Sequence, residues 1–230
     1  MATVQAREFG GPDSRAVGLM AGGSTLKTVG GVAVAVLAIL ALVGVLPAIL
    51  VAISGIVFGV AMLIEGLSIA SEYSALAGEV AEGRTEIAEF GGGVGVEVLV
   101  GIAAIALGVL ALVGVATSTM IPVLIIVGGV GLILSAGTTQ RLNDLHLASM
   151  GHTEMARSVT HAAMTGAAVA QTLGGLAAVV LGILALVDVS AAAAAGFGTL
   201  PQVGMLVLGV VVAFAGGALA GKATRLYRHS

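Results

Sequence analysis

The chain has 230 residues, of which 58% are hydrophobic and 9% are charged, and its mean hydropathy is +1.16. Soluble domains carry about 25% charged residues, so this composition excludes a soluble enzyme and a disordered chain. The lack of cysteine excludes a disulfide-stapled secreted domain, and a pI of about 5.7 argues against a nucleic-acid partner. The composition predicts an all-α integral membrane protein whose main partner is the lipid bilayer.

Four stretches of the chain contain no Asp, Glu, Lys or Arg, namely residues 28–64, 98–140, 158–187 and 189–221. One helix needs about 20 apolar residues to cross a bilayer. The first two stretches are therefore long enough for two crossings each, and the last two for one crossing each. We expect six transmembrane helices, at residues 28–46, 48–68, 95–115, 120–138, 167–188 and 200–221.

These helices pair into hairpins that polar segments separate. The expected order is a tail at 1–27, hairpins at 28–68, 95–138 and 167–221, connectors at 69–94 and 139–166, and a basic tail at 222–230. All nine basic residues lie on one side of the predicted topology. The positive-inside rule then predicts a multi-pass protein of the cytoplasmic (inner) membrane with both termini cytoplasmic.

The two connectors carry polar residues with open interpretations. Residues 69–94 have an apolar stripe at helical spacing between glutamates, which is typical of a helix packed on protein or of a solvated surface helix. Residues 139–166 contain His146, His152 and His161, whose spacing of six and nine does not match the i, i+4 pattern of a helical metal site. We expect no metal or cofactor there, and a pH response of these histidines stays open.

A nine-residue motif occurs three times. Residues 37–45 (LAILALVGV) recur as 107–115 (LGVLALVGV) and as 181–189 (LGILALVDV), at offsets of 70 and 74. A proline follows each copy (Pro47, Pro122 and Pro201), and a glycine follows each proline (Gly55, Gly129 and Gly209). Hairpins that repeat in the same orientation are related by an axis along the membrane normal. The motif therefore predicts three parallel helical-hairpin repeats with pseudo-threefold symmetry about that normal.

This pattern resembles the HdeD-like family of small bacterial membrane proteins. The resemblance is carried by residues 108–115, Pro122 and the glycines at 128–131, and again by residues 182–189, Pro201 and Gly209. It covers most of residues 28–221. The resemblance implies a six-span protein made of repeated hairpins, with a role in acid or envelope stress and with no catalytic motif.

Few ionisable groups lie in or near the spans. Glu65, Glu97 and Asp188 are each close enough to a span end to reach the interface, and a role in a transport pathway is the alternative. Lys27, Glu97 and Gln171 occupy equivalent repeat positions and should form a polar triangle at the cytoplasmic mouth. The triangle is either a structural cap, in which Lys27 pairs with Glu97, or a gate.

Two further groups of residues have expected structural roles. Gly55 and Gly59, like Gly217 and Gly221, show the GxxxG spacing that permits close helix packing. Lys222, Arg225 and Arg228 lie three apart at the inner end of the last span and should contact anionic lipid head groups. Because small residues exceed what internal packing needs, a homo-oligomer or a larger membrane complex is expected.

No catalytic motif occurs in the sequence, so we do not expect an enzyme. The first hypothesis is a non-catalytic membrane protein with a structural, scaffolding or envelope-stress-associated role, which assembles with itself or with a partner. The alternative is a small channel or transporter that uses the polar mouth on the pseudo-threefold axis.

Overall fold

In the computed structural model, the described part of the chain forms six helices. The structure describes the backbone of residues 14–77, 84–149, 154–191 and 198–226, and the side chains of residues 25–68, 95–136, 165–187 and 198–217. The helices are α1 (Ser14–Leu42), α2 (Pro47–Ala77), α3 (Arg84–Leu112), α4 (Thr117–Ser149), α5 (Glu154–Ala191) and α6 (Leu200–Leu226). No strand occurs in these described ranges.

Each helix contains one segment that is long and apolar enough to cross a membrane. These segments are Thr25–Leu42, Pro47–Ser68, Gly95–Leu112, Thr117–Ala136, Thr165–Val187 and Leu200–Gly217. They lie within a few residues of the six expected spans. The prediction of an all-α protein with six membrane-spanning helices is therefore confirmed, and the protein is a multi-pass membrane protein.

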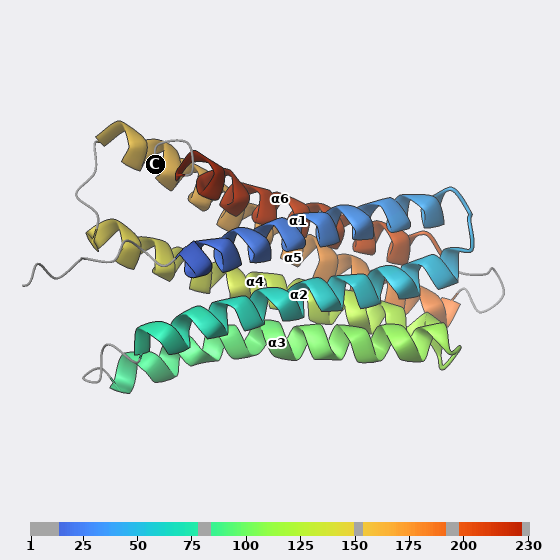
Figure 1. The fold of residues 1–230 in the computed structure, drawn as a ribbon. Helices are drawn as coiled ribbons and strands as arrows, with labels where there is room; N and C mark the ends of the chain where they lie inside the picture. Colours follow the sequence, from blue (N-terminus) through green and yellow to red (C-terminus); the bar gives the residue numbers. More distant parts are fainter. Residues whose placement is uncertain (1–13, 78–83, 150–153, 192–197, 227–230) are drawn as a thin grey trace, which may run out of the picture.

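The helices are longer than the spans that they contain. At a rise of about 1.5 Å per residue, helices of 27 to 38 residues are about 40–57 Å long, which exceeds the bilayer core of about 30 Å. The excess lies at one end of the bundle. Figure 1 shows the start of α1 and the end of α6 at that end, and the α1–α2 and α3–α4 turns at the opposite end.

The first two hairpin turns have the same local structure. Gly44 and Gly114 follow the last turns of α1 and α3 and have φ angles of +91° and +89°. In each turn the glycine N–H and the following N–H donate to carbonyls of the last helical turn, which is a Schellman motif. Glycine adopts this left-handed conformation without a steric penalty, and it thereby ends both helices.

The third copy of the motif has Asp188 where the first two have glycine, and the helix continues. Helix α5 runs on through Asp188 to Ala191. Helices α1 and α3 therefore end at the glycine of the motif, whereas α5 continues because Asp188 replaces that glycine.

The three prolines do not occupy one common position. Pro47 and Pro201 lie in the first turns of α2 and α6, where a missing N–H is tolerated, whereas Pro122 lies farther inside α4. The glycine contacts described below likewise make Gly59, rather than Gly55, the counterpart of Gly129 and Gly209.

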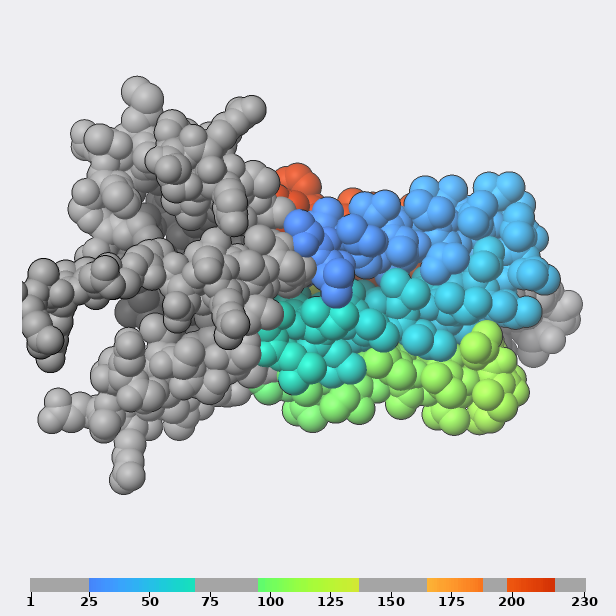
Figure 2. Space-filling model, viewed as in Figure 1, coloured from blue at the N-terminus to red at the C-terminus, as the bar shows by residue number. Residues whose placement is uncertain are grey.

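The six helices form a closed ring in chain order, in which α6 returns to pack on α1. Helices α2, α4 and α6 also contact one another across the centre, whereas α1, α3 and α5 have no mutual contacts among the described residues. The buried share of the spans reflects this difference: it is 44%, 56% and 56% for α2, α4 and α6, against 28%, 33% and 28% for α1, α3 and α5. Figure 2 shows the spans of α1, α2 and α3 packed side by side on one face.

Pairs of glycines join each hairpin to the next. A Cβ atom placed on Gly59 of α2 would lie 2.7 Å from the carbonyl oxygen of Gly101 of α3. The corresponding distance from Gly129 of α4 to the Gly175 oxygen of α5 is 2.6 Å. From Gly31 of α1 to the Gly209 oxygen of α6 it is 2.8 Å. At all three interfaces the backbones meet directly, as expected where dispersion rather than a hydrophobic drive holds helices together in lipid.

The four glycines expected to pack helices have different environments. Gly55 and Gly59 are buried, and a Cβ on Gly55 would lie 2.5 Å from Cδ1 of Leu124 in α4. Gly217 is exposed, and a Cβ there would meet no atom of the described residues within 4 Å. The close contact predicted at Gly217 is therefore wrong within this chain, because that side of α6 faces outward. The surroundings of Gly221 lie outside the described side chains.

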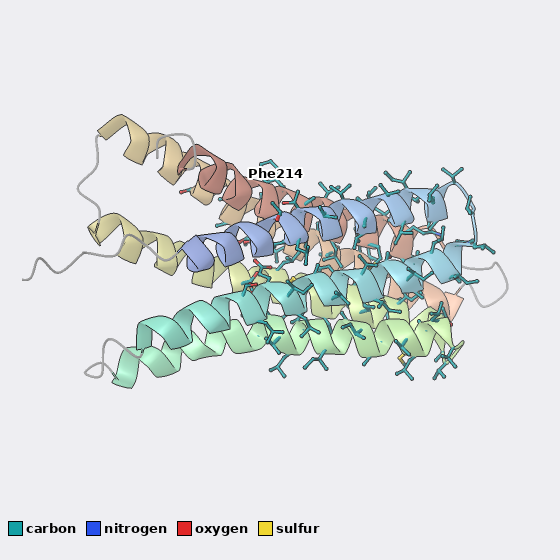
Figure 3. All side chains as sticks on the ribbon, in the orientation of Figure 1. Phe214 is labelled. Carbon is teal, nitrogen blue, oxygen red and sulfur yellow. The ribbon has the colours of Figure 1, made fainter. Side chains whose placement is uncertain are left out.

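Large apolar side chains cover the outside of the spans. Phe214 of α6 is 60% exposed and points away from the bundle in Figure 3. Exposed valine, leucine and isoleucine side chains occur on the spans of all six helices. In water such a surface would be unfavourable, whereas in lipid it contacts acyl chains of similar polarity.

Candidate functional site

The polar triangle predicted from the repeat lies inside the bundle. Lys27 of α1, Glu97 of α3 and Gln171 of α5 are 2%, 4% and 2% exposed. Each comes from one of the three outer helices, and each side chain is covered by neighbouring protein. Polar side chains this deeply buried in a membrane protein need partners.

Contacts with the next helix in the chain show that these residues occupy corresponding positions in the three hairpins. Near Lys27, a Cβ on Gly30 of α1 would lie 2.8 Å from Cβ of Ala61 in α2. Near Glu97, a Cβ on Gly131 of α4 would lie 2.8 Å from Val100 of α3. Near Gln171, a Cβ on Gly174 would lie 2.2 Å from Val211 of α6. Each contact lies about one turn from the polar residue, on the same side of it.

The partner of Lys27 is Glu65. Lys27 Nζ donates a hydrogen bond to Oε1 of Glu65 and forms an ion pair with it, and the glutamate is 12% exposed. The expected pairing of Lys27 with Glu97 is thus wrong. Helix α2, the hairpin partner of α1, brings Glu65 to the Lys27 ammonium. Glu65, which is half-buried, is therefore the ion-pair partner of Lys27.

A sequence signal for this pair exists. In a hairpin, residues about equally far from the turn lie at the same depth. Lys27 precedes Gly44 by about as many residues as Glu65 follows Leu46, so the two side chains lie level with each other. Glu97 was expected as the partner because it occupies the same position in the second copy of the repeat as Lys27 does in the first.

Glu97 lies beside this ion pair. A Cβ on Gly66, the neighbour of Glu65, would be 3.3 Å from Cβ of Glu97. Glu65 and Lys27 both act electrostatically on Glu97, with opposite sign. Oε2 of Glu97 and Oε2 of Glu65 are both buried and have no hydrogen-bond partner among the described residues. We call Lys27, Glu65 and Glu97 the charged cluster.

Gln171 enters the same level from another side of the ring. Its helix α5 packs against α4 and α6, and its Oε1 atom is buried without a hydrogen-bond partner among the described residues. The structure thus brings Lys27 and Glu97 close to Glu65, and it places Gln171 at their depth without a bond to them that could close the triangle.

Comparison of the chain with protein-family models, curated proteins and solved structures found no match. The site is therefore interpreted from its own chemistry. Within the described side chains no three His, Cys, Asp or Glu residues gather where they could hold a metal ion. What the charged cluster offers is one ammonium and two carboxylates in an apolar surrounding.

The remaining predicted residues lie outside the part of the chain whose side chains are described. Asp188 belongs to α5, and Lys222 and Arg225 belong to α6, without a description of their side chains. The same holds for His146 in α4 and His161 in α5. Arg228 and His152 lie outside the described residues. Their expected roles in lipid contact and pH response stay predictions.

Proposed function

We propose that the protein is three parallel hairpins related by an approximate threefold axis along the membrane normal. The support comes from contacts that recur at corresponding positions. The glycine pairs Gly31–Gly209, Gly101–Gly59 and Gly175–Gly129 join α1 to α6, α3 to α2 and α5 to α4. The offsets between the members on the odd-numbered helices are the 70 and 74 residues of the sequence repeat.

Bulky side chains fill the centre of this arrangement. Gly128 of α4 is the meeting point: a Cβ there would lie 3.0 Å from both Cδ1 of Leu208 in α6 and Cε1 of Phe58 in α2. Phe58 and Leu208 are fully buried. At this level α2 contributes a large aromatic side chain, α6 a leucine and α4 a glycine. The side chains of Phe58 and Leu208 fill the space that a side chain at Gly128 would need. The axis is closed at this level.

We infer from this closed axis that the protein is a non-catalytic structural subunit of the membrane, which acts by assembling with itself or with a partner in the bilayer. A packed core transmits no solute, and the long helices beyond the spans offer further surface at one end. The resemblance to HdeD-like proteins supports an envelope-stress-associated role in the cytoplasmic membrane.

Reconstitution into liposomes tests this function. We expect proton, potassium and water fluxes no higher than those of protein-free liposomes, with a protonophore as the positive control. In mild detergent or after cross-linking in native membranes, the particle should be larger than a single chain of 22.3 kDa with its bound detergent. A saturable flux through the wild-type protein, or a strictly monomeric particle in the native membrane, would contradict the proposal.

A channel or transporter is the second candidate, and the charged cluster is the observation that favours it. Ionisable groups buried in a membrane often line an ion or proton pathway. In that case flux through the wild-type protein should be present and should fall in a Glu97→Gln variant. Removal of the closed centre, by Phe58→Ala together with Leu208→Ala, should then raise it.

The topology that we propose places both termini in the cytoplasm, in accord with the distribution of the nine basic residues. The chain has no cysteine, so single cysteines report on one site each. We expect Ser118→Cys and Ala193→Cys to react with a membrane-impermeant maleimide added from outside intact cells. Ser74→Cys should react only after the membrane is opened, and the reverse pattern would overturn the topology.

A further inference from the structure

The charged side chains of the described spans all gather in one place. Within residues 25–68, 95–136, 165–187 and 198–217, the only Asp, Glu, Lys or Arg residues are Lys27, Glu65 and Glu97. With all three ionised, one ammonium and two carboxylates give the cluster a net charge of −1. A net charge inside an apolar bundle is costly unless something neutralises it.

The hydrogen-bond pattern leaves one oxygen of each carboxylate without a donor among the described residues. Lys27 donates to Oε1 of Glu65, so one carboxylate has its counter-ion. Oε2 of Glu65 and Oε2 of Glu97 have no donor among the described residues, and Glu97 is only 4% exposed. Both unpartnered atoms are acceptors. A single added proton converts one acceptor into a donor and removes the net charge at the same time.

Among the described groups that face Glu97, only the carboxylates of Glu65 and Glu97 itself can take up a proton at neutral pH, because Lys27 is already protonated. Helix α2 contributes Glu65, and α1 contributes Lys27. On the other side of α3, the described part of α4 contains no charged residue and places the buried hydroxyl of Ser135, which donates to the Leu132 carbonyl, near this level. The two unpartnered oxygens are fewer than the six to eight oxygen ligands that Ca²⁺ takes.

We propose that Glu65 and Glu97 form a proton-binding site in which the two carboxylates share one exchangeable proton, while Lys27 stays paired with Glu65. Proton uptake adds one H⁺ to the carboxylate pair and changes the cluster from a net charge of −1 to zero. This site does not depend on the proposed structural function, since a sealed bundle and a transporter can both hold it.

Infrared spectroscopy of the full chain in lipid nanodiscs tests the site. At pH 7 a solvent-exposed glutamate is ionised, because its ordinary pKa is about 4.3. We expect the wild-type protein at pH 7 to show the C=O stretch of one protonated carboxylic acid per chain. The band should shift in D₂O and on ¹³C labelling of glutamate, and it should disappear at high pH. Glu97→Gln should abolish the band, whereas the control Gln171→Leu, at the same level, should retain it.

Thermal unfolding in the same nanodiscs provides a second readout. The wild-type protein should lose stability as the pH rises through the titration of the pair, because deprotonation leaves a buried charge without a partner. Glu97→Gln mimics the protonated acid and should lose most of this pH dependence. If Glu97→Gln does not fold, the isotope-labelled wild-type spectrum alone decides the question.

A separate arm distinguishes a proton from another cation. Replacing Na⁺ or K⁺ by N-methylglucamine at constant pH and ionic strength should leave the unfolding temperature unchanged. The proposal is overturned if no protonated glutamate is found at pH 7, if the band persists in Glu97→Gln, or if stability follows Na⁺ or K⁺ concentration instead of pH.

Discussion

Gly59→Leu will destabilise the protein severely, whereas Gly217→Leu will not. A Cβ on Gly59 would lie 2.7 Å from the Gly101 carbonyl oxygen and 2.8 Å from the Ile105 backbone nitrogen. These are backbone atoms of α3, so relief requires separation of the two helices along the interface. Overpacking commonly costs about 1–3 kcal/mol, and a contact with rigid backbone should exceed that range, at about 3 kcal/mol or more.

Gly217→Leu is the matched control for this change. It introduces the same side chain into the interior of another spanning helix, but no atom of the described residues lies within 4 Å of the Cβ position. Leucine also has the higher helix propensity. The unfolding of both variants is measured in one detergent by circular dichroism or thermal precipitation. Only Gly59→Leu should show a loss of stability. Equal stability of the two variants would mean that α2 and α3 do not meet through Gly59.

Removal of Lys27 is expected to have the other large effect. Lys27→Met leaves Glu65 and Glu97 together in the bundle without their cation. Breaking a buried ion pair from one side costs about 3–5 kcal/mol, because the remaining charge stays buried. The loss should be greatest at high pH and smaller at low pH, where protonation of the carboxylates removes the repulsion.

A double-mutant cycle identifies the partner of Lys27. Lys27→Met combined with Glu65→Gln should be less destabilising than the sum of the single changes, with a coupling of about 0.5–3 kcal/mol. The parallel cycle with Glu97→Gln is the control and should show the weaker coupling, because Glu97 makes no ion pair with Lys27 in the structure. A stronger coupling of Lys27 to Glu97 than to Glu65 would contradict the ion pair seen in the structure.

The spans were predictable because bilayer thickness sets their length and because charges are excluded from them. Absence of charge alone located all six, within a few residues of the spanning segments found in the described helices. The nine-residue motif was equally visible in the sequence. Only the structure shows that Gly44 and Gly114 end their helices, whereas α5 continues past Asp188. Lys27, Glu97 and Gln171, which the sequence singled out, are all buried.

The sequence by itself determined that the chain is all-helical and where its six candidate membrane spans lie. Only the tertiary structure decided which face of each helix is buried and which neighbours meet. The spans are apolar on every side, so no polar stripe marks the lipid-facing side, and Gly59 and Gly217 look alike in the sequence although one is buried and the other exposed. The rotation of each helix about its axis, and the return of α6 to α1, come from close packing. That packing gave Lys27 its partner in Glu65 and left Glu97 beside the pair.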